Sequence, residues 1–301
     1  MALEVTDVTH SDLKAPAKTM TMENDGFHGA LFSPEADVCS EKALILFGGS
    51  DGNFRDACKL ARMFCAEGIT VLALAYWNAP GLPDELAAVP VESVQRAALW
   101  LRENGRNKIG LWGISMGAEY ALLAGSLLPG LISCVVAVSA MDVVSQGCSG
   151  KGLPHTVNTS AFSWTGNPLP YMSIPEWSLG RVLRESLKSH EYTMSFAYAT
   201  ARPHAPEDSV IPVECITGPV LLISAKEDSM WPSAEAGERI VARLDAHDFS
   251  FAHKHLIYEF GSHMMIPMPV KLFRMERKHP SECLRDKRDS FRQTIRFLQE
   301  W

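Results

Sequence analysis

A short stretch of glycine, serine and apolar residues is the first place in this sequence where chemistry could occur. It reads Gly-Ile-Ser-Met-Gly over residues 113–117, after an apolar run and before a segment typical of a helix. A nucleophile elbow needs this strand-turn-helix setting, because the tight turn exposes the serine and the glycines let strand and helix approach. Composition alone predicts roughly 0.1 copies of G-x-S-x-G in a chain of this length. The context therefore makes Ser115 a candidate nucleophile, against the alternative of a glycine turn without chemistry.

A serine nucleophile needs a histidine base, and the imidazole needs an acid that holds its tautomer. In α/β hydrolases the order along the chain is serine, then acid, then histidine after the last strand. Of ten histidines, His263 alone follows the final predicted core strand through a glycine turn. Asp228 follows the preceding strand, with Glu227 as a weaker alternative acid and Asp142 as a second one. The pattern predicts a triad of Ser115, Asp228 and His263.

Backbone amides that could hold a developing negative charge come from two places. One is the residue after the nucleophile, Met116, and the other is the glycine-rich loop 48–52. A well-aimed donor of this kind contributes roughly 3 kcal/mol to transition-state binding. The loop could instead cradle phosphate, but it lacks the Lys-Ser/Thr ending of a P-loop and no G-x-G-x-x-G accompanies it. The amides of Gly49, Ser50 and Met116 are the predicted oxyanion hole.

Alternating strand and helix patterns would position these residues. Near-continuous apolar runs followed by amphipathic segments indicate a mostly parallel sheet with helices on both faces, which is an α/β fold. The predicted strands span 26–34, 43–49, 70–76, 108–113, 131–139, 219–225 and 254–260. The predicted helices span 55–68, 91–104, 232–246 and 283–301, with a further one near 179–200.

The alternation breaks once, between about residues 148 and 212. This segment is rich in glycine, proline, serine and aromatic residues, and it is too long for an ordinary connection. We expect a cap or lid here, with residues 1–147 and 213–301 forming the core. Candidate walls of a substrate pocket are Trp164, Tyr171, Trp231 and Met264. The aromatic residues of the segment could equally form a small core of their own.

Composition and charge exclude other classes of protein. The 301 residues have an ordinary globular composition, and a net charge of −7 argues against a general nucleic-acid binder. Residues 271–301 carry nine Lys/Arg against five Asp/Glu. We interpret this local basic character as the solvated face of a C-terminal helix rather than an anion site.

The termini, cysteines and histidines bear on compartment and cofactors. The first ten residues are too polar for a signal peptide, and no stretch reaches the ~18 apolar residues of a membrane helix. Seven cysteines without C-x-x-C spacing, most of them in apolar runs, indicate reduced and buried thiols. An isolated H-x-H at 253–255 without a third ligand is poor evidence for metal. We expect a cytoplasmic protein that uses no metal or cofactor; the oligomeric state stays open.

Several strings in fixed order resemble one known family over about residues 43 to 270. They resemble the C-terminal catalytic domain of the acyl-CoA thioesterase and bile acid-CoA:amino acid N-acyltransferase family, an α/β hydrolase similar to dienelactone hydrolases. The resemblance implies a triad of Ser115, Asp228 and His263 and acyl thioesters as substrates. The strings are "LILFGGSDGNFRDA", "LALAYWNAPGLPDEL", "GISMGAEYAL", "WTGNPLPYM", "IPVECITGPVLLISAKEDSMWPS" and "GSHMMIPMP".

The resemblance also bears on the acceptor and shows two departures. Amino-acid-conjugating members carry cysteine where this chain has Ser115, so the serine favours water over an amine. Mammalian members carry an N-terminal β-sandwich domain, whereas only about 40 residues precede the core here. Residues 264–268 read Met-Met-Ile-Pro-Met where the family typically has a proline-and-tyrosine segment. These methionines could suit an apolar acyl group or merely pack the loop.

The leading hypothesis is a serine hydrolase of acyl thioesters, with acyl-CoA as the substrate. A carboxylesterase or lactonase acting on small oxygen esters would need the same triad. Transfer of the acyl group to an amine is a third hypothesis. A non-catalytic binding protein on a hydrolase scaffold is the fourth.

Overall fold

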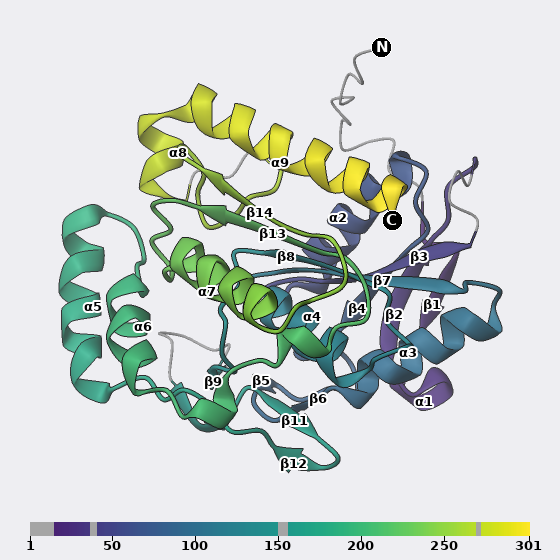
Figure 1. Cartoon of the computed structure of the whole chain (residues 1–301), viewed down its shortest axis with the longest axis horizontal. Helices are drawn as coiled ribbons and strands as arrows, with labels where there is room; N and C mark the ends of the chain where they lie inside the picture. Colours follow the sequence, from purple (N-terminus) through teal and green to yellow (C-terminus); the bar gives the residue numbers. More distant parts are fainter. Residues whose placement is uncertain (1–14, 37–40, 150–155, 269–271) are drawn as a thin grey trace.

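An eight-stranded sheet forms the centre of the computed structural model, which describes residues 15–36, 41–149, 156–268 and 272–301 (Figure 1). The first two strands in its order run antiparallel to their neighbours, and the other strands are parallel. In spatial order the strands are β1 Lys18–Met20, β2 His28–Phe32, β4 Val71–Ala75, β3 Lys42–Phe47, β7 Lys108–Ile114, β8 Cys134–Val138, β13 Val220–Ala225 and β14 His253–Tyr258.

Helices cover both faces of this sheet (Figure 1). Leu44 and Leu46 of β3 pack towards one helix pair, whereas Ile45 and Phe47 pack towards a second group. Because both faces are covered, the central strands are apolar throughout rather than alternating. The pair comprises α2 Phe54–Ala66 and α9 Pro280–Glu300, and the group comprises α3 Glu92–Glu103, α4 Met116–Leu127 and α7 Ser233–Ala246.

The predicted strands and core helices are confirmed to within a few residues. Strand β1, which pairs with β2 at the sheet edge, was not predicted because "KTM" has too little apolar character. A short helix, α1 Met22–Asp25, follows it. The single helix predicted near 179–200 is wrong in extent. Two helices occupy this region, because His190 adopts a left-handed backbone with φ of 54° and ends the first.

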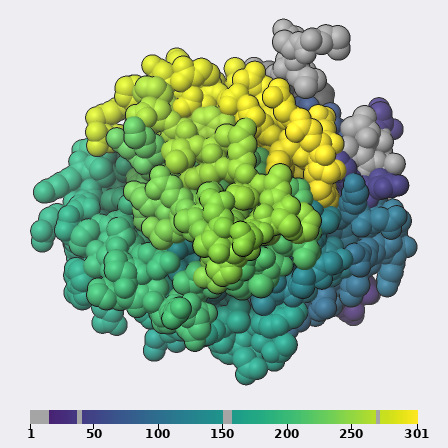
Figure 2. Space-filling view, viewed as in Figure 1, coloured from purple at the N-terminus to yellow at the C-terminus, as the bar shows by residue number. Residues whose placement is uncertain are grey.

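The 148–212 segment lies beside the sheet rather than in it. Two small sheets join it to residues that precede α3, and in Figure 2 its teal and green side chains cover one side of the molecule beside α7. Residues 150–155, which include His155, lie outside the described residues. The small strands are β5 Glu85–Leu86, β9 Gln146–Ser149 and β10 Thr156–Ser160 in one sheet, and β6 Val89–Pro90, β11 Phe162–Trp164 and β12 Asn167–Pro168 in the other.

Helices complete this region. α5 packs against α6 at the outer edge of the molecule, away from the central sheet (Figure 1). The chain then returns to β13 through three 3₁₀ turns. These elements are α5 Glu176–Ser189, α6 Ser195–Ala201, η1 Arg202–His204, η2 Glu207–Ser209 and η3 Val213–Cys215, and a further helix, α8 Arg274–Lys278, precedes α9.

The cysteines are free thiols wherever the structure describes them, which confirms the reduced state predicted for those residues. The prediction that they are buried is wrong for Cys215, which is exposed, and only partly right for Cys58 and Cys148. Cys39 lies outside the described residues. Burial raises the pKa of the Cys134 thiol, so this side chain behaves as an apolar core residue.

Lys287 is an exception to the prediction that the basic residues near the C-terminus face solvent. Its side chain is only 2% exposed and forms an ion pair with Glu276. Most of the other cations of α9 do face solvent. None of the helices in the described ranges combines the length and the hydropathy that crossing a bilayer requires.

Candidate active site

Ser115 occupies the turn between β7 and α4. Its backbone has φ of 58° and ψ of −127°, a strained combination for a residue with a side chain. The amide of Ser115 donates to the carbonyl of Val138 at 2.9 Å, and its own carbonyl accepts from the amide of Ala118 at 2.8 Å. The turn is therefore held by β8 on one side and by the first turn of α4 on the other.

The two glycines of the motif are required by close backbone contacts. A Cβ atom at Gly113 would lie 1.9 Å from the carbonyl oxygen of Gly117. A Cβ atom at Gly117 would lie 2.1 Å from the carbonyl oxygen of Gly48, in the loop after β3. Side chains at either position would separate the elements that meet at Ser115.

Ser115, His263 and Asp228 lie together as predicted from their order in the sequence. The Nε2 atom of His263 is 2.8 Å from the Ser115 hydroxyl, and its Nδ1 atom is 2.9 Å from both carboxylate oxygens of Asp228. All three residues are at most 7% exposed. They meet because Asp228 follows β13, His263 follows β14 and Ser115 follows β7, and the carboxyl ends of parallel strands share one edge of the sheet.

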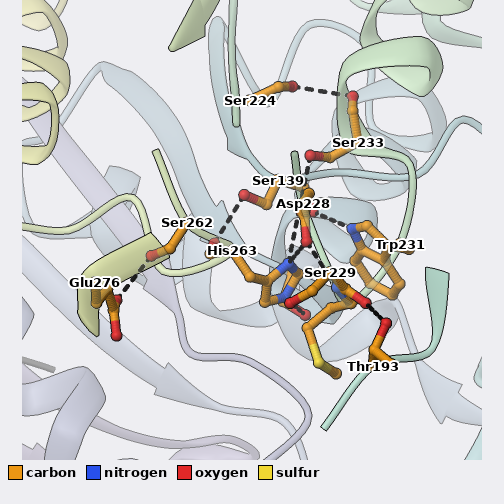
Figure 3. A network of polar contacts seen from close by, with 12 residues as sticks. Ser139, Thr193, Ser224, Asp228, Ser229, Trp231, Ser233, Ser262, His263 and Glu276 are labelled. Atoms are coloured by element: carbon orange, nitrogen blue, oxygen red, sulfur yellow. Dashed lines mark hydrogen bonds and ion pairs between the residues drawn. The ribbon is translucent and has the colours of Figure 1, made fainter. Parts of the chain in front are cut away.

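Hydrogen bonds from neighbours fix the orientation of Asp228. Its Oδ2 atom accepts from the hydroxyl of Ser233 at 2.7 Å, and its Oδ1 atom accepts from the amide of Met230 at 2.9 Å. The same carboxylate faces the His263 ring, as Figure 3 shows. The acid is thus oriented by bonds separate from those it makes to histidine.

Ser139 and Trp231 make further contacts with His263. The hydroxyl of Ser139 donates to the carbonyl of His263 at 2.8 Å, and the indole of Trp231 donates to the carbonyl of Ser139 at 2.8 Å (Figure 3). The Trp231 ring lies edge-on to the His263 ring, with centroids 5.4 Å apart. Tyr198 of α6 packs edge-on against Trp231 in turn. The 148–212 segment therefore reaches the triad through one intervening side chain.

The two alternative acids, Asp142 and Glu227, have different surroundings from Asp228. Asp142 binds Arg202 at 2.5 Å and Arg239 at 2.9 Å. Burial alone would raise the pKa of Asp142, but hydrogen bonds from Arg239 and Arg202 outweigh it and hold that pKa below its usual value. Glu227 is exposed at the surface. Asp228 is the acid that contacts His263.

The glycine-rich loop after β3 lies against Ser115. A Cβ atom at Gly49 would be 3.6 Å from that of Ser115. The hydroxyl of Tyr76 donates to the carbonyls of Gly48 and Gly49 at 3.0 and 2.9 Å, which fixes how this loop is turned. Met116 begins α4, where the amides lack partners within the helix. The predicted oxyanion hole is compatible with these positions and stays a prediction.

The candidate pocket residues fall into two groups. Trp231 contacts His263 directly. Tyr171 lies in the 148–212 segment, where its hydroxyl donates to Asn158 at 3.3 Å, and Trp164 packs at the edge of the core. Met264 packs against the core beneath α2 and α9. Sequence alone could not separate the residue that reaches the triad from those that pack elsewhere.

Three supporting residues were not identified from the sequence. Ser139 follows β8, Ser233 begins α7, and Tyr76 follows β4, so all three lie where strands end or helices begin at the edge that carries the triad. This placement was the available signal, since polar residues at such positions face the site. Which of them bond to triad residues is a matter of side-chain geometry. Within the described ranges, no group of three or more His, Cys, Asp or Glu side chains could hold a metal ion.

A cavity of about 150 Å³ is lined in part by Ser229 and Ser262, which are the chain neighbours of Asp228 and His263. Its lining carries charges of both signs, from Glu191 and Glu227 and from Arg274 and Lys278 of α8. The charges that line the cavity therefore favour neither an anionic nor a cationic ligand.

The chain matches a family model described as "BAAT / Acyl-CoA thioester hydrolase C terminal" over residues 89–278. It is 28% identical over 240 residues to the rat mitochondrial acyl-coenzyme A thioesterase 2, covering 77% of this chain and 47% of that protein. It is 26% identical over 244 residues to the mouse acyl-coenzyme A amino acid N-acyltransferase 1, covering 79% of this chain and 52% of that protein. The chain thus spans about half the length of the curated relatives it matches.

Solved structures confirm the predicted α/β hydrolase fold. A Klebsiella pneumoniae protein described as a dienelactone hydrolase superposes with a TM-score of 0.57 at 13% identity, covering 89% of this chain and 92% of that one. An esterase from Pyrococcus furiosus superposes with a TM-score of 0.52 at 15% identity, covering 96% and 98% of the two chains. At these identities the likeness concerns the fold alone.

Proposed function

Because the chain belongs to the BAAT / acyl-CoA thioester hydrolase C-terminal family, we propose that it hydrolyses acyl thioesters, with acyl-CoA as the first substrate class to test. The proposal takes Ser115 as nucleophile, His263 as general base and Asp228 as the acid that orients the imidazole. The chain of bonds from Ser115 through His263 to Asp228, at 2.8 and 2.9 Å and shielded from solvent, is the observation that carries it.

Acylation begins when the Ser115 hydroxyl attacks the thioester carbonyl while His263 Nε2 accepts its proton. Asp228 stabilises the imidazolium that forms. The amides of Met116 and of the Gly49 and Ser50 loop hold the oxyanion of the tetrahedral intermediate. The C–S bond then breaks, and the thiolate leaves more readily than an alkoxide would, because a thiol is a stronger acid than an alcohol, and takes the proton from His263.

Deacylation repeats the same steps with water. His263 accepts a proton from a water molecule, which attacks the acyl-Ser115 ester, and the tetrahedral intermediate collapses to release the carboxylic acid. The proton returns to the serine oxygen. Serine rather than cysteine at this position favours water as the acceptor of the acyl group. In this respect the chain resembles the thioesterases of the family rather than its amino-acid-conjugating members.

The proposal is tested by turnover of acyl-CoA substrates of graded chain length with the purified protein. Ser115→Ala should lower turnover by roughly 10³-fold or more, because the remaining oxyanion donors act without a nucleophile. Ser126→Ala is the matched control. Ser126 is also buried, and its hydroxyl donates to the carbonyl of Leu123 at 2.8 Å. Undiminished turnover in Ser115→Ala would overturn the mechanism.

Matched substrates separate this proposal from the rival hypotheses. Faster turnover of an oxygen ester than of its thioester analogue would favour a carboxylesterase or lactonase. Conjugate formation in the presence of glycine or taurine would favour transfer to an amine. A folded protein whose Ser115 resists a fluorophosphonate probe would favour a binding protein without catalysis.

The roles of the 148–212 segment and of the compartment are also proposals. We propose that the segment acts as a cap, because Tyr198 reaches Trp231 beside His263. Relatives include a mitochondrial and a peroxisomal thioesterase by name, so the cytoplasmic location predicted from the sequence remains to be tested by localisation of the tagged protein.

A further inference from the structure

A fully buried ion pair lies behind the loop that carries His263. Lys287 of α9 and Glu276 of α8 contact each other, and their side chains are 2% and 3% exposed. Lysine and glutamate are almost never this deeply buried unless they are paired. Neither residue touches Ser115 or takes part in the proton transfers described above.

Glu276 connects this pair to Ser262, which precedes His263 in the chain, and to Phe273, whose ring packs against the His263 ring. Its Oε1 atom accepts the hydroxyl of Ser262 at 2.8 Å as well as the Lys287 ammonium. Its Oε2 atom accepts the amide of Phe273 at 3.1 Å. The Phe273 ring packs at an angle to the His263 ring, with centroids 6.1 Å apart. In Figure 3 Ser262 and Glu276 lie on the side of His263 opposite to Trp231.

Helix α9 holds the same loop at two further points. The carboxylate of Asp286 accepts the amide of Phe260 at 3.0 Å, and the hydroxyl of Ser290 donates to the carbonyl of Met265 at 3.0 Å. These bonds flank His263 in sequence. Helix α9 therefore holds the loop directly on both sides of the proposed base, and it also reaches Ser262 indirectly, through Lys287 and Glu276 of α8.

Stability alone gives a weak physical reason for such a pair. The desolvation of two buried charges can cancel their mutual attraction, and apolar replacements of similar volume are often neutral or stabilising. Positional accuracy gives a stronger reason. A displacement of about 1 Å in a catalytic group can lower the rate by roughly 10²-fold.

We propose that Glu276 and Lys287 are positioning residues for His263 that act through Ser262. The Lys287 ammonium orients the Glu276 carboxylate, which in turn holds the hydroxyl of Ser262, the residue before His263, and the amide of Phe273, whose ring packs against the imidazole. The inference rests on the proposed role of His263 as the base. It goes beyond that role by assigning a function to a buried charge pair outside the triad.

Ser262→Ala is the first test, because it cuts the link and leaves the Glu276–Lys287 pair intact. We expect kcat to fall at least tenfold with KM unchanged, because positioning affects the proton transfer and not substrate binding. The thermal midpoint should stay close to that of Ser126→Ala, which removes an equally buried hydroxyl far from the loop. Equal kcat values for Ser262→Ala and Ser126→Ala would overturn the proposal.

The double variant Glu276→Gln with Lys287→Met removes both charges and nearly preserves volume. The new amide oxygen can still accept from the Phe273 amide, but the contact with Ser262 becomes a weaker neutral bond in which the hydroxyl accepts instead of donating. We expect a thermal midpoint no more than a few degrees from wild type and a kcat lowered several-fold or more. A folded double variant with wild-type kcat would also overturn the proposal.

Labelling of Ser115 by a fluorophosphonate separates failure of this inference from failure of the proposed function. If the wild-type protein hydrolyses no thioester but is labelled, the labelling rate replaces kcat, since it too depends on His263. Slower labelling of Ser262→Ala than of Ser126→Ala supports the positioning role. Equal labelling rates contradict it, whatever the natural substrate is.

Discussion

Glu119 is a fully buried carboxyl group one helical turn after Ser115. Both its carboxylate oxygens face Ser145, whose amide and hydroxyl lie 2.7 Å away. Desolvation by burial raises the pKa of Glu119 from 4.5 to about 8, although the bonds from Ser145 lower it in part. At neutral pH the folded protein therefore favours the protonated side chain, while the unfolded chain carries it ionised.

This difference makes stability depend on pH in a definite direction. The folded state binds a proton that the unfolded state releases above 4.5, so the contribution of Glu119 to stability is lost as the pH rises from 4.5 to about 8. The slope is about 1.4 kcal/mol per pH unit at most. Glu119→Gln, whose neutral amide can bond both groups of Ser145, should lack this slope in urea unfolding at pH values across that range.

Glu235→Gln is the control for this experiment, because Glu235 is an exposed residue of α7. It should leave the pH dependence of the unfolding free energy as in wild type. A constant difference between wild type and Glu119→Gln at every pH would show that Glu119 is ionised in the folded protein.

At the scale of elements, the site depends on how closely α4 approaches β7 and the loop after β3. Gly117 lies so near that loop that a Cβ atom would fall 2.1 Å from the Gly48 carbonyl and 3.0 Å from the Phe47 Cβ. Backbone cannot yield as a flexible side chain can. Helix α4, which begins after Ser115, and the predicted oxyanion loop therefore share one tight contact.

Gly117→Ala should consequently lose both stability and activity. We expect the unfolding free energy to fall by about 3 kcal/mol or more, because the backbone of helix or loop must move. Gly180→Ala in α5 is the control, since nothing lies within 4 Å of its added Cβ. That variant should gain about 0.5 to 1 kcal/mol in chemical denaturation. Equal effects of the two substitutions would contradict the close contact.

At the scale of the whole molecule, Asp142 joins three parts of the chain. It follows β8 and binds Arg202 in the 148–212 segment and Arg239 on α7. Because the pKa of Asp142 is held below its ordinary 3.8, these bonds stabilise the fold at neutral pH, and their contribution is lost only as the pH falls below 3.8. The segment is thus attached to the core by charge as well as by its small sheets.

Arg202→Met should loosen this attachment while Arg239 still neutralises Asp142. A bond to a charged group contributes about 1.5 to 3 kcal/mol, so we expect faster cleavage within residues 148–212 in limited proteolysis mapped by mass spectrometry. Arg184→Met, at an exposed position on α5, should leave the cleavage rate unchanged. Equal cleavage rates in both variants would argue that the small sheets alone hold the segment.

Periodicity and motif order predicted the architecture and the grouping of Ser115 and His263 with an acid. Strands buried on both faces must be apolar throughout, so the parallel core was visible in the sequence, and the carboxyl ends of such strands had to bring Ser115, Asp228 and His263 to one edge. The choice of Asp228 over Glu227 and Asp142 needed geometry. All three follow late strands, but only Asp228 lies beside the His263 ring.

What the sequence could not determine depends on contacts between distant segments. The helix predicted near 179–200 continued past His190, but the left-handed backbone of that residue divides α5 from α6. The burial of Lys287 could not be predicted from the sequence either. A lysine on an amphipathic helix is expected to face solvent, and its buried partner, Glu276, is known only from the structure. Local sequence patterns determine the helices and strands and the order of the candidate catalytic residues along the chain. The protonation, burial and partners of each charged side chain depend instead on desolvation and hydrogen bonds between distant segments, which only the tertiary structure determines.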